Sequence, residues 1–236
     1  MIQAIIFDLD DTIVVSDVPY KTLWESSVKC FNTELGALDF TTLYKVIRET
    51  ADWYWSDPER HREGRQDLVL FRRKIVNMAL EKLGRPNEAL ATKIADEYSA
   101  ERTEHEVLVP HSVETLDNLR RRGLKLGLIT NGGSAMQRAK IDKFKIEPYF
   151  DNILIEGEFG CGKPDERVFT HTLEKLNALA TTAWMTGDDL NRDIAPCNSL
   201  GIYTLWVNVN GSKPAADTKA RPDKVISSIA EIPELL

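Results

Sequence analysis

The first twelve residues constrain the fold more than any other stretch of the chain. Residues 1–6 form an almost wholly apolar run, which suits a strand that is covered on both faces in the middle of a parallel sheet. Carboxylates then follow abruptly at Asp8, Asp10 and Asp11, where such a strand would end. Open α/β sheets bind ligands at the carboxyl ends of their strands, so we expect the functional site here.

Asp8 and Asp10 are two residues apart, and in an extended segment such residues point the same way. Both carboxylates can then face one small volume. Like charges packed together are costly unless a cation lies between them or one carboxyl takes a proton. The six residues 7–12 also allow a simpler interpretation, a polar turn in which Asp and Thr cap a loop.

The rest of the chain divides into two kinds of sequence. Between about 17 and 105, apolar residues recur at helical spacing in four stripes, and no strand pattern is present. After 105, apolar strand patterns alternate with helical ones, which is typical of a parallel, doubly wound sheet. The expected strands lie at 124–130, 153–155, 183–186 and 203–207, with a short one in the tail after 225.

We therefore predict an α/β fold: a doubly wound parallel-sheet core with an inserted, all-helical domain. Residues 1–16 and 106–236 form the core domain, and 17–105 form the helical insertion. The insertion joins the core through two segments, near Ser16 and Glu106. Such a double connection permits hinge motion over a site.

Composition excludes several classes of protein. The 236 residues carry a formal net charge of −7, which argues against a nucleic-acid binder. Three widely spaced cysteines, Cys30, Cys161 and Cys197, fit reduced thiols better than disulfides or a zinc site. No apolar run approaches the roughly 18 residues that span a membrane, and we find no signal peptide. We expect a cytoplasmic protein, monomeric or homodimeric, with no nucleic-acid or membrane partner.

Polar groups recur where the expected core strands end. They are Asp8 with Asp10, Thr130 with Asn131, Lys163 in the loop after the third strand, and Asp188 with Asp193. Each alone has an ordinary explanation: a turn, a solvated lysine, or acids that favour a helix N-terminus. Their recurrence at corresponding ends of successive strands indicates one site. Ser134 with Gln137 matches a capping box that opens the next helix.

This set of motifs resembles the haloacid dehalogenase-like (HAD) hydrolase superfamily, in its phosphatase branch, over nearly the whole chain. Asp8 to Thr12 match its Asp-x-Asp-x-Thr pattern, Thr130 the second motif, and Lys163-Pro164 the third. Gly187-Asp188 with Asp193 matches the fourth, and the helical insertion resembles the C1 cap. Among members, the segment Leu-Ile-Thr-Asn-Gly at 128–132 and the Ile-Pro-Glu-Leu-Leu ending are most similar to N-acylneuraminate-9-phosphatase-like proteins.

The resemblance implies a role for each motif residue. Asp8 is the expected nucleophile, Asp10 the general acid and base, and Lys163 the cation that neutralises Asp8 and the phosphate. The expected phosphate contacts are Thr130, Asn131, Gly132 and Lys163. Mg²⁺ is the expected cofactor, held by the carboxylates of Asp8 and Asp188 and the backbone carbonyl of Asp10, with Asp193 behind them. Asp189 competes with Asp193 for that last role.

The function that follows is a Mg²⁺-dependent phosphomonoesterase, which acts on a small phosphorylated metabolite through an aspartyl phosphate. An alternative is a phosphomutase of the same superfamily, and a third is a metal-binding regulatory module. Asp10 argues for phosphoryl chemistry, because the haloacid dehalogenases proper lack an acid there. Asp11 and His111 stand where the family more often has glycine.

Overall fold

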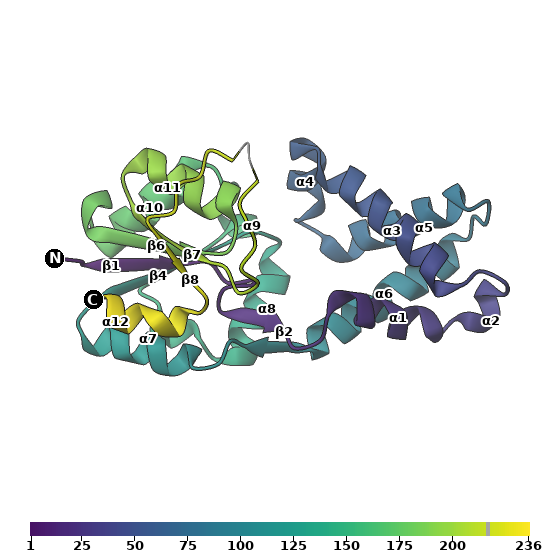
Figure 1. Cartoon of the computed structure of the whole chain (residues 1–236), viewed down its shortest axis with the longest axis horizontal. Coiled ribbons are helices and arrows are strands. Elements are labelled where there is room, and N and C mark those ends of the chain that lie inside the picture. The colour runs from purple at the N-terminus through teal and green to yellow at the C-terminus, as the bar shows by residue number, and fades with distance from the viewer. Residues whose placement is uncertain (216–217) are drawn as a thin grey trace. The chain divides into compact units, whose positions relative to one another are not determined.

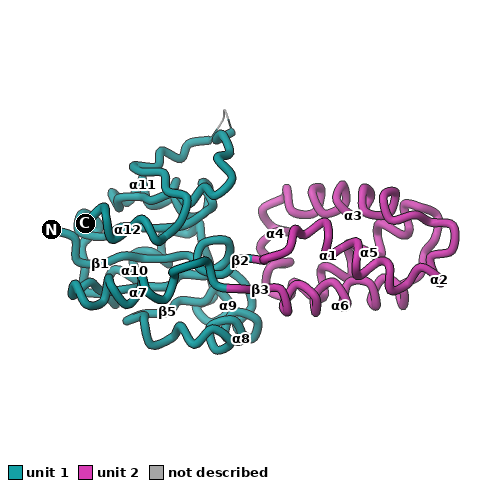
Figure 2. The backbone as a smooth tube through the Cα atoms, turned by 60° about the horizontal axis from the view of Figure 1, so that its bottom comes forward, with its two compact units in different colours: residues 1–15, 108–236 teal, residues 16–107 magenta. Residues whose placement is uncertain are grey.

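The computed structural model describes residues 1–215 and 218–236. Two compact units can be distinguished (Figure 2), one made of Met1–Val15 and Leu108–Leu236 and the other of Ser16–Val107. These boundaries lie within two residues of the expected core and insertion. That the helical unit serves as a cap stays a prediction. Each unit is described by itself below.

A six-stranded sheet forms the centre of the larger unit, in the order β5-β4-β1-β6-β7-β8. Every neighbouring pair is parallel, which confirms the predicted doubly wound α/β fold. The strands are β1 (Ala4–Phe7), β4 (Lys125–Thr130), β5 (Asn152–Ile155), β6 (Ala183–Gly187), β7 (Tyr203–Val207) and β8 (Lys224–Ile226). The first apolar run of the sequence is thus a central strand, as its composition predicted.

Strand β1 is buried on both faces because helices cover both sides of the sheet (Figure 1). Ile5 and Phe7 belong to a core that includes Leu116 and Leu119 of α7. Ala4 and Ile6 point to the opposite face and join a second core with Phe169 of α10, among others. The alternation of side chains along a strand explains why the sequence reads as continuously apolar.

In the larger unit, helices alternate with the strands along the chain. They are α7 (Ser112–Arg121), α8 (Ser134–Phe144), η1 (Glu147–Tyr149), α9 (Glu156–Phe159), α10 (Glu166–Leu176), η2 (Ala180–Thr182), η3 (Leu190–Ile194), α11 (Ala195–Leu200), η4 (Ile229–Glu231) and α12 (Ile232–Leu235). Asp165 caps α10, since its side chain accepts a hydrogen bond from the Arg167 backbone N–H.

The strand order reverses beside β1, and this positions the site. The chain runs from β1 to β4 and β5 on one side, then returns to β6 on the other. Phe7, the last residue of β1, is in register with Leu128 of β4 and Thr186 of β6. The segments that follow these three strands therefore meet at one edge of the sheet, which is where ligands bind in such folds.

The smaller unit is built from helices around its own apolar core. The helices are α1 (Tyr20–Lys29), α2 (Asn32–Leu35), α3 (Phe40–Trp55), α4 (Pro58–Gly64), α5 (Leu68–Lys82) and α6 (Glu88–Glu104). Its buried residues include Leu43, Ile47 and Ile94, and the Asn87 side chain caps α6. The sequence missed α4, where Asp57 caps a short helix that begins with Pro58.

The two connecting segments pair as a small sheet of β2 (Val14–Ser16) and β3 (Glu106–Leu108). The strands expected from the sequence did not include β3. In the part of the chain that the structure describes, no helix combines the length and the apolar character needed to cross a membrane.

Candidate active site

A buried lysine connects two of the predicted site aspartates. Lys163 is 2% exposed, and its Nζ lies 2.7 Å from Oδ1 of Asp8 and 2.6 Å from Oδ1 of Asp193. Asp8 is 9% exposed and Asp193 has no exposed surface. A buried lysine is rare unless it is paired, so this ammonium is fixed by the two carboxylates.

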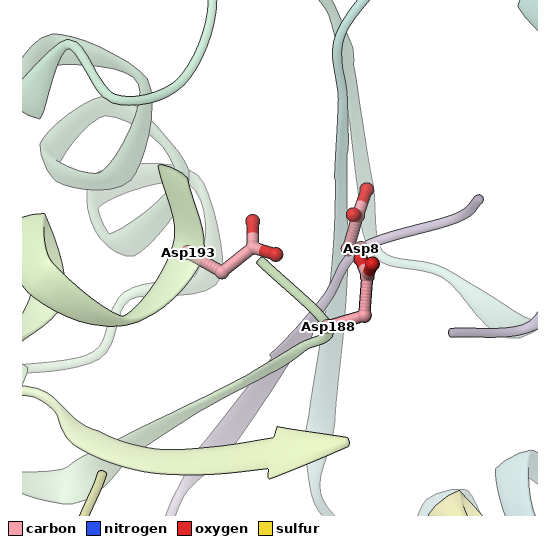
Figure 3. A group of neighbouring side chains, drawn as sticks. All are labelled: Asp8, Asp188 and Asp193. Atoms are coloured by element: carbon pink, nitrogen blue, oxygen red, sulfur yellow. The ribbon is translucent and has the colours of Figure 1, made fainter. Parts of the chain in front are cut away.

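Asp188 completes a compact acidic group with Asp8 and Asp193 (Figure 3). One carboxylate oxygen from each residue lies within 4.8 Å of the other two. Asp8 follows β1, Asp188 follows β6, and Asp193 comes from η3. The group therefore lies at the carboxyl ends of the central strands, where the strand order reverses. Carboxylate oxygens are the ligands that Mg²⁺ prefers.

Burial and mutual repulsion both act against ionisation of this acidic group. Burial raises the pKa of Asp8 to about 7; Lys163 opposes this rise and Asp193 adds to it. Burial also raises the pKa of Asp188 to about 9, with the charges of Asp8 and Asp193 adding to it. Burial acts to lower the pKa of Lys163, but the two facing carboxylates outweigh it and the pKa is raised. A divalent cation among these oxygens would favour the ionised carboxyls.

The chain is shaped locally so that Asp193 can point inward. A side chain at Gly187 would collide with the Asp193 carboxylate, so only glycine leaves room for it at the end of β6. The Asp189 backbone N–H donates to Asp193 Oδ2 at 3.0 Å. Asp193 lies in η3, a five-residue π-helical turn, and such turns occur often at functional sites.

Asp189 has a different task. Its Oδ1 accepts hydrogen bonds from the backbone N–H groups of Asn191 and Arg192, both at 2.9 Å, and its side chain also pairs with the Arg192 guanidinium. It therefore caps η3 and lies outside the acidic group of the described residues. Of the two acids that the sequence left open, Asp193 is the one that faces Asp8 and Lys163.

Asn131 holds the backbone of Lys163. Its Nδ2 donates to the Lys163 carbonyl at 2.7 Å, and its Oδ1 accepts from the Lys163 N–H at 2.7 Å. Gly162 permits this approach, because a Cβ there would lie 2.5 Å from Asn131 Oδ1. The Asn131 side chain thus links the end of β4 to the loop that carries Lys163.

The other predicted phosphate contacts are also bonded within the protein. The Gly132 N–H donates to Glu156 Oε2 at 3.0 Å, and Glu156 itself is buried. Thr130 is 1% exposed, and its Oγ1 accepts from Gln137 Nε2 at 2.5 Å. The structure therefore places both residues at the carboxyl end of β4, with these polar groups bonded within the protein.

Asp10 turns toward α8. Its Oδ1 lies 2.5 Å from Lys140 Nζ, and its Oδ2 accepts from Gln137 Nε2 at 2.8 Å. The carboxylate of Asp10 is not a member of the acidic group among the described residues. This position is compatible with a metal contact through the Asp10 backbone carbonyl, since the carboxylate is directed to α8.

The predicted capping box at α8 is wrong. The helix begins at Ser134 without a side-chain cap on Gly133, and Ser134 Oγ donates to Glu158 instead. Gln137 is 2% exposed, and its Nε2 donates to Asp10 Oδ2 and to Thr130 Oγ1. Sequence reasoning missed Gln137 and Lys140 as site residues, although their spacing of three places them on one helix face.

Curated proteins similar to this chain are phosphatases. A glyceraldehyde 3-phosphate phosphatase of Methanocaldococcus jannaschii is 28% identical over 242 residues, which cover 100% of this chain and 97% of that protein. The N-acylneuraminate-9-phosphatase of Mus musculus is 33% identical over 154 residues, 65% of this chain and 61% of that protein. The predicted resemblance to the phosphatases is thereby confirmed.

Solved structures share the whole fold. The 2-haloacid dehalogenase from Pseudomonas syringae pv. Tomato DC3000 is 27% identical with a TM-score of 0.63, over 100% of this chain and 98% of that one. The HAD hydrolase YfnB from Bacillus subtilis, bound to magnesium, has a TM-score of 0.74 over the same shares at 19% identity, which shows the fold alone. The chain itself matches the haloacid dehalogenase-like hydrolase family over residues 2–201, so it belongs to that family and is a hydrolase.

Proposed function

We propose that this protein is a Mg²⁺-dependent phosphomonoesterase that works through a phosphorylated Asp8. The observation that carries the proposal is the position of Asp8. It stands directly after the central strand, paired with the buried Lys163 and grouped with Asp188 and Asp193. A carboxylate next to a fixed ammonium and a metal-binding group is suited to attack an anionic phosphate, because the surrounding positive charge offsets the repulsion.

In the first step an Asp8 oxygen bonds to phosphorus, and the bond from phosphorus to the leaving oxygen breaks. Asp10 gives its proton to that oxygen, so that an alcohol leaves. The product is an aspartyl phosphate on Asp8. Lys163, held by Asn131 and Asp193, keeps its positive charge beside Asp8 and offsets charge on the transferred group.

In the second step water attacks phosphorus and Asp10 takes a proton from it. The bond between Asp8 and phosphorus breaks, which releases inorganic phosphate and restores the Asp8 carboxylate. The net reaction consumes one water and yields one alcohol and one phosphate. Asp10 ends each cycle protonated, ready to serve as acid again.

The residues that would hold Mg²⁺ are Asp8 and Asp188 through their carboxylates and Asp10 through its backbone carbonyl. Asp193 belongs to the same acidic group, and its role is to hold Lys163 in place through their ion pair. When bound, Mg²⁺ would supply positive charge that offsets the repulsion between the Asp8 carboxylate and the phosphate.

The substrate class is a small phosphorylated metabolite. Relatives of this chain act on substrates as different as glyceraldehyde 3-phosphate and N-acylneuraminate 9-phosphate. Both are phosphomonoesters of small hydroxylated carbon compounds, which supports that class without choosing a member. We infer that the helical unit, residues 16–107, acts as a cap that selects among such substrates.

A phosphate-release screen of sugar phosphates, phosphorylated acids and nucleotides tests this function. We expect release with Mg²⁺ and none with chelator, and the Asp188→Ala variant should need more Mg²⁺ for half-maximal rate. Full activity in chelator would contradict the metal assignment. Transfer of phosphate to a second sugar position, in place of release, would indicate a mutase.

A further inference from the structure

A buried lysine lies beside Asp10 and is not used by the mechanism above. Lys140 of α8 is 6% exposed, and its Nζ lies 2.5 Å from Asp10 Oδ1. Burying an ammonium is unfavourable unless a partner compensates for the lost water. The Asp10 side chain keeps 34% of its surface exposed, so the buried lysine holds a carboxylate that still reaches solvent.

Gln137 adds a second anchor from the preceding turn of the same helix. Its Nε2 lies 2.8 Å from Asp10 Oδ2, 2.5 Å from Thr130 Oγ1 and 2.8 Å from the Asn131 carbonyl. Each carboxylate oxygen of Asp10 thus has its own donor on α8. The same amide ties Asp10 to the end of β4, where Thr130 and Asn131 lie.

We infer that Lys140 and Gln137 are positioning residues that act through Asp10. They fix the plane of its carboxylate relative to Thr130 and Asn131, so that the second lone pair of one oxygen can carry the proton for the leaving group and later accept one from water. A two-point anchor matters because proton transfer requires hydrogen-bond distance and alignment. The inference rests on the proposed function, since it assigns these residues to the acid–base step of that reaction.

Leaving-group dependence separates this role from simple packing. Phenyl phosphate and p-nitrophenyl phosphate are nearly the same size, but phenolate is much the poorer leaving group and depends more on an acid. The value of kcat/KM reports the steps up to and including departure of the phenol. A variant that misplaces Asp10 should therefore suffer more with phenyl phosphate.

The experiment measures kcat/KM for both esters in wild type, Lys140→Met and Gln137→Met, each checked by thermal unfolding. We expect Lys140→Met to lose at least about ten-fold more with phenyl phosphate than with p-nitrophenyl phosphate, part of the roughly 10²–10⁴-fold that acid–base help provides. Gln137→Met should shift the ratio the same way, which keeps the test open if the first variant unfolds. Lys140→Arg should restore part of the loss.

A double-mutant cycle gives the second readout. In an Asp10→Asn background, adding Lys140→Met should change kcat/KM for p-nitrophenyl phosphate by less than about two-fold, because its partner is already gone. Lys143→Met, an exposed lysine of the same helix, is the matched control and should behave as wild type. Equal losses with both esters, or an unchanged Lys140 effect without Asp10, would overturn the inference. Failure of the wild-type protein to hydrolyse either ester would instead reject the proposed function, and the inference with it.

Discussion

Lys163 Nζ lies 2.7 Å from Asp8 Oδ1, and both side chains are almost closed to solvent. This pair joins the first residue after β1 to a loop 155 positions later in the chain, and Asn131 fixes that loop through two hydrogen bonds. The nucleophile proposed here is therefore oriented by the fold before any substrate arrives. Several measurable consequences depend on this arrangement.

Lys163→Met should destabilise the metal-free protein strongly. The variant leaves Asp8 and Asp193 buried without their ammonium, and breaking a buried pair costs about 3–5 kcal/mol. Urea unfolding at pH 8 in chelator measures the free energy of unfolding. Lys125→Met, which removes an exposed partner of Asp151, is the control and should cost less than about 1 kcal/mol. Similar losses for both variants would show that Lys163 is not held as described.

The metal-free protein should become less stable as pH rises from about 4 toward 9. Burial raises the pKa of Asp8 to about 7 and that of Asp188 to about 9, both above the 3.8 that is usual for an aspartate carboxyl. The folded protein then binds more protons than the unfolded chain within this window, and the free energy of unfolding falls with pH. Thermal unfolding in chelator from pH 5 to 9 measures this trend, and we expect the unfolding temperature to fall across the series.

Added Mg²⁺ should reverse that trend. Its binding requires ionised carboxyls, so the gain in unfolding temperature should grow from pH 5 to pH 9. The matching measurement adds Mg²⁺ at each pH of the chelator series. A gain in unfolding temperature that does not vary with pH would argue that Asp8 and Asp188 are not the ligands.

Asn131→Leu should lower both stability and kcat. Leucine has nearly the same shape but removes both bonds to the Lys163 backbone, and unsatisfied buried groups cost about 1–3 kcal/mol each. Because Lys163 would lose its fixed position, kcat should fall more than KM rises. Asn118→Leu, at an exposed position of α7, provides the comparison. If Asn131→Leu changed only KM, the side chain would be a phosphate contact, as the sequence first indicated.

The central strand, the sheet and the positions of the motif residues were predictable because they depend on local pattern. Residues 4–7 are all apolar, as expected for a short strand that is buried on both faces, and Asp8 follows them directly. The contacts of α8 were not predictable. Ser134 and Gln137 match a capping box locally, but their partners lie 24 and 127 positions away, at Glu158 and Asp10. Tertiary hydrogen bonds outweighed the local motif.

The path of the chain around Asp193 also escaped prediction. Asp193 lies in the π-helical turn η3, and the regular helix α11 begins after it at Ala195. Two substitutions for glycine are explained by the backbone: Asp11 and His111 have φ of 58° and 65°. In that region glycine is the least strained residue, and Asp or His is tolerated singly.

The most direct test of the account is to trap phosphate on the enzyme. Asp10→Asn with p-nitrophenyl phosphate should give a burst of nitrophenol and then slow turnover, because the acidic phenol leaves unaided while water attack lacks its base. Acid-quenched protein should be about 80 Da heavier, roughly one phosphoryl group, with the label on the peptide that contains Asp8. Asp8→Asn should show neither burst nor label. A label on Asp10, or continued turnover with no label under rapid quench, would contradict the assignment of Asp8 as the nucleophile.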